Sequence, residues 1–231
     1  MFPIMFRIGP FNIYSWGFMI AVAFIAGLFS ALHYARKEGI PETNILDLFV
    51  YVMISSIVGA RLFYIAAFWD QYRSDPFSIL FVSEGGLAFF GGLFLAILAT
   101  ILYVNLKKLD IFKMLDIMSP PAALGYGIGR IGCFLNGCCY GITICGVVQP
   151  TQIYSSLAGF AIFAFLVYYY GKKRYNGHIF LIALLLYSIY RFLIEFVRFS
   201  PIHFWIFTPS QLIAGAVLIA AAMTLWKKNT T

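Results

Sequence analysis

The segment GRIGCFLNGCCYG, residues 129–141, combines one arginine, one asparagine, three cysteines and four glycines inside an otherwise apolar part of the chain. A guanidinium in apolar surroundings is costly unless it is paired or faces a polar cavity. Its planar fork of donors matches the oxygens of a phosphate or a carboxylate. The glycines allow the backbone to approach a bulky group closely. The segment therefore indicates an anion site around Arg130.

Two further arginines, Arg61 and Arg191, also lie within apolar stretches. In YSIYRFLIEFVR the spacing places Tyr187, Arg191 and Glu195 on one face of a helix, at i, i+4 and i+8. Three such arginines in one small protein favour a common anionic ligand over three separate structural roles. The alternative is that each arginine extends to an interface or forms a structural ion pair, with Asp47, Asp116 or Glu195 as its partner.

The four cysteines, Cys133, Cys138, Cys139 and Cys145, suggest other chemistries. Their spacing lacks the paired C-x2-C pattern of zinc sites and no histidine is near, which argues against a metal. A nucleophilic thiolate stabilised by Arg130 is a second interpretation. We favour the third, in which the cysteines are small apolar packing residues, and we expect neither a metal nor a cofactor.

The elements that must position these residues are membrane helices. Of 231 residues, 62% are hydrophobic and 11% are charged, too few charges to cover a soluble domain. Apolar stretches of about 20 residues indicate membrane spans. The net charge of +7 comes from short basic clusters between them, so it does not indicate nucleic acid binding. We predict one all-α, polytopic membrane domain over residues 1–231, with helices at 12–34, 46–69, 78–105, 112–135, 152–171, 177–197 and 206–226.

The basic residues between the spans predict the orientation. With seven spans, ten Lys and Arg residues fall on one side and only Arg7, Arg73 and Arg198 on the other. The positive-inside rule then places the amino terminus outside and the carboxyl terminus in the cytoplasm. A six-span interpretation would put basic clusters on both sides. The basic side holds Arg36, Lys37, Lys107, Lys108, Lys113, Lys172, Lys173, Arg174, Lys227 and Lys228.

Two other segments carry unusual residues for a membrane protein. SEGGLAFFGGLF, residues 83–94, contains two Gly-Gly pairs, which indicate either a broken helix or re-entrant loop, or close helix packing through small residues. QPTQIYSS, residues 149–156, is a polar turn that opens the fifth span, with Pro150 suited to a first helical turn. Gln152 and Tyr154 offer hydrogen-bonding groups there.

Together these motifs resemble the family of prolipoprotein diacylglyceryl transferases. The segment 129–141 resembles the family signature, and other family blocks follow in the same order over nearly the whole chain. These blocks are GARLFYI at 59–65, EGGLAFFGG at 84–92, QPTQIY at 149–154 and YRFLIEFVR at 190–198. The resemblance implies a bacterial inner-membrane enzyme of seven helices with an external amino terminus, in agreement with the distribution of charge.

The resemblance also implies a reaction. The diacylglyceryl group of phosphatidylglycerol passes to the thiol of the lipobox cysteine of a prolipoprotein, a thioether forms, and glycerol 1-phosphate leaves. The nucleophile belongs to the substrate, so the enzyme needs no nucleophile or metal, and membrane lipids are its other partners. The catalytic positions implied are Arg130, Arg191, Tyr187 and Glu195. The substrate-binding positions inferred from the motifs are Arg130, Gly129, Gly132, Asn136, Gly137, Gly141, Arg61 and Gln152.

Several positions depart from the family pattern. The family often has a histidine, proposed as a base, where this chain has Phe90, so the thiol proton would leave to Glu195 or to water. Cys133, Cys138, Gln149 and Trp16 also replace residues common in the family. These departures keep open a paralogue that uses another acceptor. Broken helices and buried charges also suit a second alternative, a transporter of an anionic solute. Arg61 is expected nearer a charged interface, with a smaller role than Arg130 and Arg191.

Overall fold

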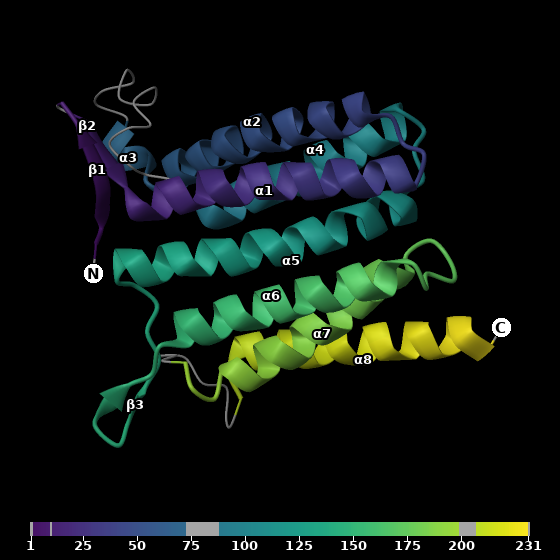
Figure 1. Cartoon of the computed structure of the whole chain (residues 1–231). Helices are drawn as coiled ribbons and strands as arrows, with labels where there is room; N and C mark the ends of the chain where they lie inside the picture. The colour runs from purple at the N-terminus through teal and green to yellow at the C-terminus, as the bar shows by residue number, and fades with distance from the viewer. Residues whose placement is uncertain (1, 10, 73–87, 199–206, 231) are drawn as a thin grey trace. The chain divides into compact units, whose positions relative to one another are not determined.

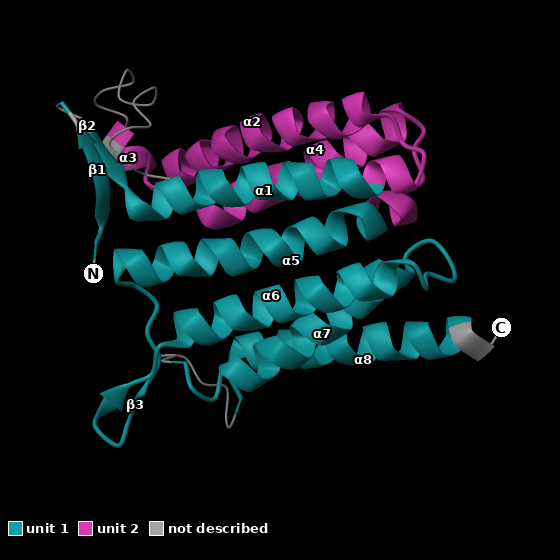
Figure 2. Cartoon of the chain, in the orientation of Figure 1, with its two compact units in different colours: residues 1–34, 115–231 teal, residues 35–114 magenta. Residues whose placement is uncertain are grey.

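The computed structural model describes residues 2–9, 11–72, 88–198 and 207–230 (Figure 1). The chain divides into two compact units, residues 1–34 with 115–231 and residues 35–114, which we call unit 1 and unit 2 (Figure 2). The described chain contains seven helices of at least 17 residues and a short one, α3. They are α1 (Ser15–Lys37), α2 (Glu42–Ala67), α3 (Trp69–Tyr72), α4 (Phe89–Leu106), α5 (Ile111–Asn136), α6 (Thr151–Tyr170), α7 (His178–Ile194) and α8 (Pro209–Thr230).

The helical prediction is confirmed apart from the helix ends and two hairpins. Strands β1 (Ile4–Ile8) and β2 (Phe11–Tyr14) pair antiparallel, so residues 12–14, expected to be helical, are a strand. The backbone N–H of Ser15 donates to the carbonyl of Pro3 at 2.9 Å, which joins the hairpin to the start of α1. The second hairpin, β3 (Thr143–Ile144) and β4 (Val147–Val148), follows α5.

The other helix ends differ from the prediction by a few residues. Helix α7 ends at Ile194, not 197, because the chain after it pairs with the segment that follows α5 through an isolated bridge between Gly141 and Arg198. Helix α4 is described only from Phe89, so the expected start of the third span at 78, the first Gly-Gly pair (85–86), and Arg73 lie outside the described residues.

Unit 1 holds the helices of the signature segment. In Figure 1, α5, α6, α7 and α8 run in alternating directions, α6 contacts α7, and α7 contacts α8. Helices α5 and α6 meet where both carry glycine: a Cβ added to Gly159 would lie 2.8 Å from the backbone nitrogen of Gly127. Ser156 donates to the carbonyl of Gly127 at 2.9 Å across this contact. Small residues therefore bring the backbone of α5 against α6.

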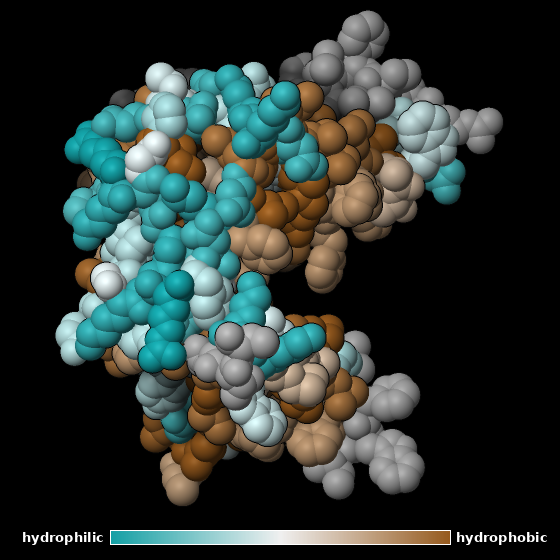
Figure 3. Space-filling view, turned by 90° about the vertical axis from the view of Figure 1, so that its right-hand side faces the viewer, coloured by the Kyte–Doolittle hydropathy of each residue, from teal (hydrophilic) through white to brown (hydrophobic). Residues whose placement is uncertain are grey.

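The apolar helices fit a multi-pass membrane protein. In the described part of the chain, five helices are long and apolar enough to cross a membrane: α1, α2, α4, α6 and α8. Helix α7 is shorter, with 17 residues, and α5 is less apolar because it carries charged residues and two prolines. At one end of unit 1, basic residues follow α6 and occupy the last turn of α8. Figure 3 looks onto the end of the molecule where α8 finishes and shows hydrophilic residues gathered there.

In unit 2, α2 packs against α4 through the second Gly-Gly pair. Gly91 and Gly92 are buried, and a Cβ on Gly91 would lie 2.3 Å from the Cβ of Phe63 and 2.5 Å from the carbonyl oxygen of Gly59. For this pair the structure supports close helix packing, because both glycines lie in the first turn of a regular helix.

Replacement of Gly91 by alanine is expected to destabilise the protein by about 1–3 kcal/mol, because an added methyl group would force α2 and α4 apart. Thermal unfolding of the purified protein in detergent would measure the loss. Gly215→Ala, on α8, is the matched control, since no atom lies within 4 Å of its added Cβ. Equal stability of the two variants would contradict the packing role.

Candidate active site

Arg130 lies on α5 beside an aromatic ring and a cavity. Its guanidinium carbon is 4.9 Å from the ring centroid of Tyr126, one turn earlier on the same helix, a cation–π contact. Arg130 and Gln152, from α6, line one cavity of about 250 Å³. Among the residues that the structure describes, no carboxylate lies within ion-pair distance of Arg130. Its charge is therefore available to an anion from outside the chain.

The first turn of α6 holds the segment that follows Arg130. Gln152 is 1% exposed, and its Nε2 donates to the carbonyl of Cys138 at 2.5 Å. Thr151 Oγ1 donates to the carbonyl of Cys139 at 2.8 Å. The other amide atom of Gln152, Oε1, is buried and has no hydrogen-bond partner among the described residues. A buried acceptor without a donor is costly, so this atom is suited to a donor supplied by a ligand.

Arg191 is fixed on α7 by two neighbours. Its Nη1 lies 3.0 Å from Glu195 Oε2, an i,i+4 ion pair, and its Nη2 donates to Ser210 Oγ at 3.0 Å. Glu195 is buried and its other oxygen accepts from Thr208 Oγ1 at 3.2 Å. The predicted shared helix face of Arg191 and Glu195 is thus confirmed. A guanidinium has five N–H groups, so Arg191 keeps donors for a further partner.

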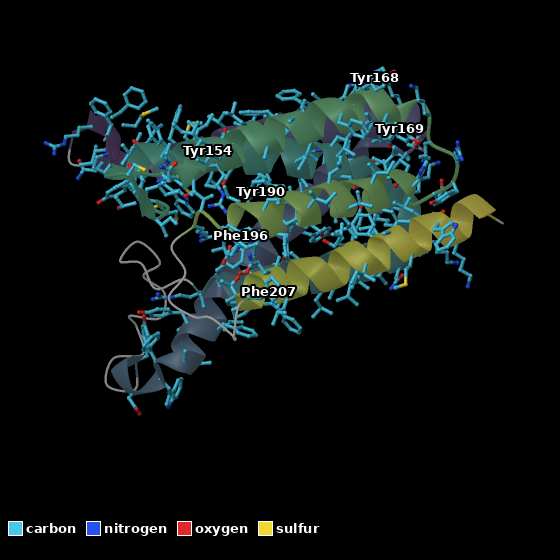
Figure 4. All side chains as sticks on the ribbon, turned by 90° about the horizontal axis from the view of Figure 1, so that it is seen from below. Tyr154, Tyr168, Tyr169, Tyr190, Phe196 and Phe207 are labelled. Carbon is cyan, nitrogen blue, oxygen red and sulfur yellow. The ribbon has the colours of Figure 1, made fainter. Side chains whose placement is uncertain are left out.

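Three tyrosines link α5 to α7. The ring of Tyr187 meets that of Tyr126 edge to face, with centroids 5.5 Å apart. The hydroxyls of Tyr126 and Tyr190 are 2.9 Å apart, and Tyr190 donates to Ser155 Oγ, on α6, at 2.5 Å. In Figure 4, Tyr190 lies on α7 and Tyr154 on the neighbouring α6. The Arg130 guanidinium is therefore connected through aromatic side chains to the helix that carries Arg191.

Tyr187 also borders an apolar cavity. With Tyr126 it lines a space of about 280 Å³ whose other lining residues are almost all apolar. The ring of Tyr126, which lines the same cavity, also carries the Arg130 guanidinium against its face. Cationic groups beside an apolar cavity suit a ligand with an anionic head and hydrocarbon chains.

The comparisons with known proteins identify the family. The sequence pattern that defines the prolipoprotein diacylglyceryl transferases matches residues 3–227 of this chain. The chain belongs to this family. The departures at Phe90, Cys133 and Cys138 therefore occur within a prolipoprotein diacylglyceryl transferase.

Named relatives agree over nearly the whole length. A phosphatidylglycerol–prolipoprotein diacylglyceryl transferase from Finegoldia magna is 38% identical over 228 residues, which cover 94% of this chain and 92% of the relative. A protein of the same name from Clostridium tetani is 33% identical, with 87% of each chain covered. The second such transferase of Clostridium perfringens is 32% identical, with 92% of this chain and 90% of the relative covered.

In this diacylglyceryl transferase, the signature glycines contact neighbouring elements closely. A Cβ on Gly132 would lie 2.9 Å from the Cβ of Met19 on α1, and a Cβ on Gly141 would lie 2.3 Å from the carbonyl oxygen of Val197. Gly137 has a φ of +77°, which a side chain would strain. Gly129 has only Ile20 nearby, at 3.6 Å. These glycines therefore bring α1 and the chain after α7 against the signature segment.

One predicted site residue, Arg61, and one departure from the family pattern, Phe90, lie in unit 2. Arg61 is buried on α2, and its guanidinium carbon is 5.2 Å from the ring centroid of Tyr72. The side chain of Phe90 is 80% exposed. The assignment of Arg61 to substrate binding stays a prediction.

Four side chains of the candidate site were not predicted from the sequence. Tyr126 lies one turn before Arg130 on α5, and Tyr190 directly precedes Arg191 on α7. A tyrosine near each arginine in the sequence was therefore the available signal. Ser155 lies in the same polar turn, residues 149–156, as the predicted Gln152 and Tyr154. Arg198, counted as a loop charge, is joined to the signature segment by the backbone bridge with Gly141. Burial raises the pKa of the Cys139 thiol, and the positive charges of Arg130 and Arg198 offset part of this rise.

Proposed function

We propose that this chain transfers the diacylglyceryl group of phosphatidylglycerol to the lipobox cysteine of prolipoproteins in the bacterial inner membrane. Family membership and the names of its relatives support this reaction. The observation that carries the proposal is the cavity shared by Arg130 and Gln152. Among the described residues, its guanidinium has no carboxylate partner and its Gln152 carbonyl oxygen has no hydrogen-bond donor, which suits the phosphate and a glycerol hydroxyl of this lipid.

The phosphate is proposed to bind between two arginines. Arg130 contacts it from α5, and Arg191 contacts it from α7 with the donors that Glu195 and Ser210 leave free. Because Glu195 is already paired with Arg191, we assign it the role of holding this guanidinium in place. Tyr187, one of the catalytic positions that the family resemblance implies, borders the apolar cavity, and we assign it a contact with the lipid. Further contacts are assigned to the signature segment, at Gly129, Gly132, Asn136, Gly137 and Gly141.

The chemistry follows from these positions. The sulfur of the substrate thiol attacks the glyceryl carbon next to the phosphate oxygen, a C–S bond forms, and the C–O bond breaks. Glycerol phosphate takes the bonding electron pair, and negative charge builds on its oxygens. Guanidinium groups fixed in a water-poor site stabilise that charge strongly. The same positive field favours ionisation of the thiol, and the thiol proton leaves to water or to a basic group in the site.

The direct test is an in vitro assay with labelled phosphatidylglycerol and a peptide that carries a lipobox cysteine. We expect label to appear on the peptide as a thioether, which survives conditions that hydrolyse esters. A peptide with serine in place of the cysteine is the control. Release of glycerol phosphate without a labelled peptide would indicate another acceptor, and movement of an anionic solute without lipid turnover would indicate a transporter.

We also propose seven spans, with the amino terminus outside and the carboxyl terminus in the cytoplasm, in a single domain over residues 1–231. The asymmetry of the basic residues supports this orientation. Reporter fusions after residues 37, 108, 174 and 228 should all report the cytoplasm. An external signal at any two of these positions would refute the seven-span topology.

The enzyme's own cysteines should be dispensable for transfer, because the attacking thiol belongs to the substrate. A variant with all four cysteines replaced by serine or alanine is expected to keep measurable activity in the peptide assay. Size-exclusion chromatography in detergent checks that it is folded. Complete loss of transfer in a folded variant would instead indicate an enzyme thiol in the mechanism.

A further inference from the structure

Three of the four cysteines converge although their spacing in the sequence did not suggest it. The sulfur atoms of Cys133, Cys138 and Cys139 all lie within 4.8 Å of one another. The sulfurs of Cys138 and Cys139 are 3.5 Å apart. Cys133 and Cys138 are partly buried and Cys139 is exposed, so the cluster has one side open to solvent. We call these residues the thiol cluster.

The backbone reverses direction to build the thiol cluster. Gly137 has a φ of +77° and Cys139 a φ of +66°, and the N–H of Cys138 donates to the carbonyl of Cys133 at 3.1 Å. A left-handed conformation costs a non-glycine residue about 1 kcal/mol or more, so surrounding contacts must hold it. Gln152 and Thr151 do so, through their hydrogen bonds to the carbonyls of Cys138 and Cys139. The sulfurs are therefore held together before any ligand binds.

Three thiolates at this separation suit a thiophilic cation. Zn–S bonds of about 2.3 Å at tetrahedral angles place the sulfurs about 3.8 Å apart. The sulfurs of Cys138 and Cys139 are 3.5 Å apart and all three lie within 4.8 Å of one another, so small side-chain shifts suffice. Three thiolates and a divalent cation leave one net negative charge. The charges of Arg130 and Arg198, both of which act on Cys139, offset it. The fourth position of a tetrahedral ion would face the open side at Cys139 and take water.

We propose that Cys133, Cys138 and Cys139 form a three-thiolate site for a thiophilic divalent cation of the zinc type. The site is separate from the reaction proposed above, which uses no metal. It lies at the end of the helix that carries Arg130, and Thr151 and Gln152 connect it to α6. A cation there would fix the turn that directly follows the helix of Arg130.

The test uses the reduced protein in detergent and Cd²⁺ as a spectroscopic probe for zinc. Thiolate binding gives an ultraviolet sulfur-to-cadmium charge-transfer band, which we expect to saturate near one Cd²⁺ per chain and to disappear when Zn²⁺ is added. Cys133→Ser, Cys138→Ser and Cys139→Ser should each weaken binding at least about tenfold, as loss of a directly coordinating group exceeds the effect of losing an outer contact. Cys145→Ser, outside the cluster, should bind like the wild type.

A second measurement needs no variant. Bound Zn²⁺ should protect the three cluster cysteines of the wild-type protein from a thiol-alkylating reagent, while Cys145 is still modified, as read by peptide mass spectrometry. The proposal is overturned if no charge-transfer band forms, if Cys145→Ser loses as much affinity as the cluster variants, or if all four cysteines are alkylated equally. A Cys138-containing disulfide that forms in place of cation binding would also overturn it. None of these results depends on transferase activity.

Discussion

Arg130→Ala and Arg191→Ala are each expected to lower the rate of diacylglyceryl transfer by about 100- to 1000-fold, the usual effect of removing one fixed charge contact from a dry site. Arg130 has no carboxylate partner in the described chain, and Arg191 keeps donors beyond those used by Glu195 and Ser210. Lysine should restore little activity at either position, because its point charge cannot reproduce a planar fork. The peptide assay measures the rate per mole of folded enzyme.

The matched control is Arg36→Ala. Arg36 is an exposed arginine near the end of α1, paired with Glu42 at 2.5 Å, and its loss should leave the rate unchanged. Near wild-type rates in folded Arg130→Ala and Arg191→Ala would exclude the two-arginine clamp. If only the yield of folded protein falls, at unchanged specific activity, the arginines are structural, and the pairing of Arg191 with Glu195 is then the whole of its role.

Asp116→Ala is expected to destabilise the protein by about 3–5 kcal/mol, the range for breaking a buried charge pair. Asp116, on α5, is fully buried and lies 3.5 Å from the ammonium group of Lys173. Its two oxygens accept the backbone N–H groups of Gly177 and Phe180, at 2.8 and 2.9 Å, at the start of α7. Removal of the carboxylate leaves a cation and two donors without their acceptor. Circular dichroism, recorded while the protein unfolds in detergent, measures the loss of stability.

Asp110→Ala is the control for Asp116. Asp110 also accepts two backbone N–H groups, from Phe112 and Lys113, at the start of α5, but it is exposed. Water can replace the contacts of Asp110, so we expect its removal to lower the free energy of unfolding by about 0.5–2 kcal/mol, as is typical for loss of a helix cap. Specific activity of the folded fraction should be unchanged in both aspartate variants, in contrast to the arginine variants. Equal destabilisation of the two would show that burial of Asp116 contributes nothing.

Sequence alone determined the features that depend on neighbours along the chain. Apolar runs of sufficient length predicted the helices, and their order gave the all-α class, because helix formation and burial in lipid depend on local composition. The ion pair of Arg191 with Glu195 followed from i,i+4 spacing for the same reason. The signature around Arg130 and the family blocks in order identified the family, which the match over residues 3–227 then established.

Tertiary structure alone decided which distant residues meet. Nothing local links Arg130 to Gln152, or Tyr190 to Ser155, because these contacts form only when α5, α6 and α7 pack together. The alternative interpretation of the arginines offered Asp116 as a partner for one of them, but the turn between α6 and α7 brings Lys173 and two backbone donors to it. The convergence of Cys133 with Cys138 and Cys139 needs two left-handed residues, Gly137 and Cys139. Hydrogen bonds from the first turn of α6, which is distant in sequence, help to hold that turn.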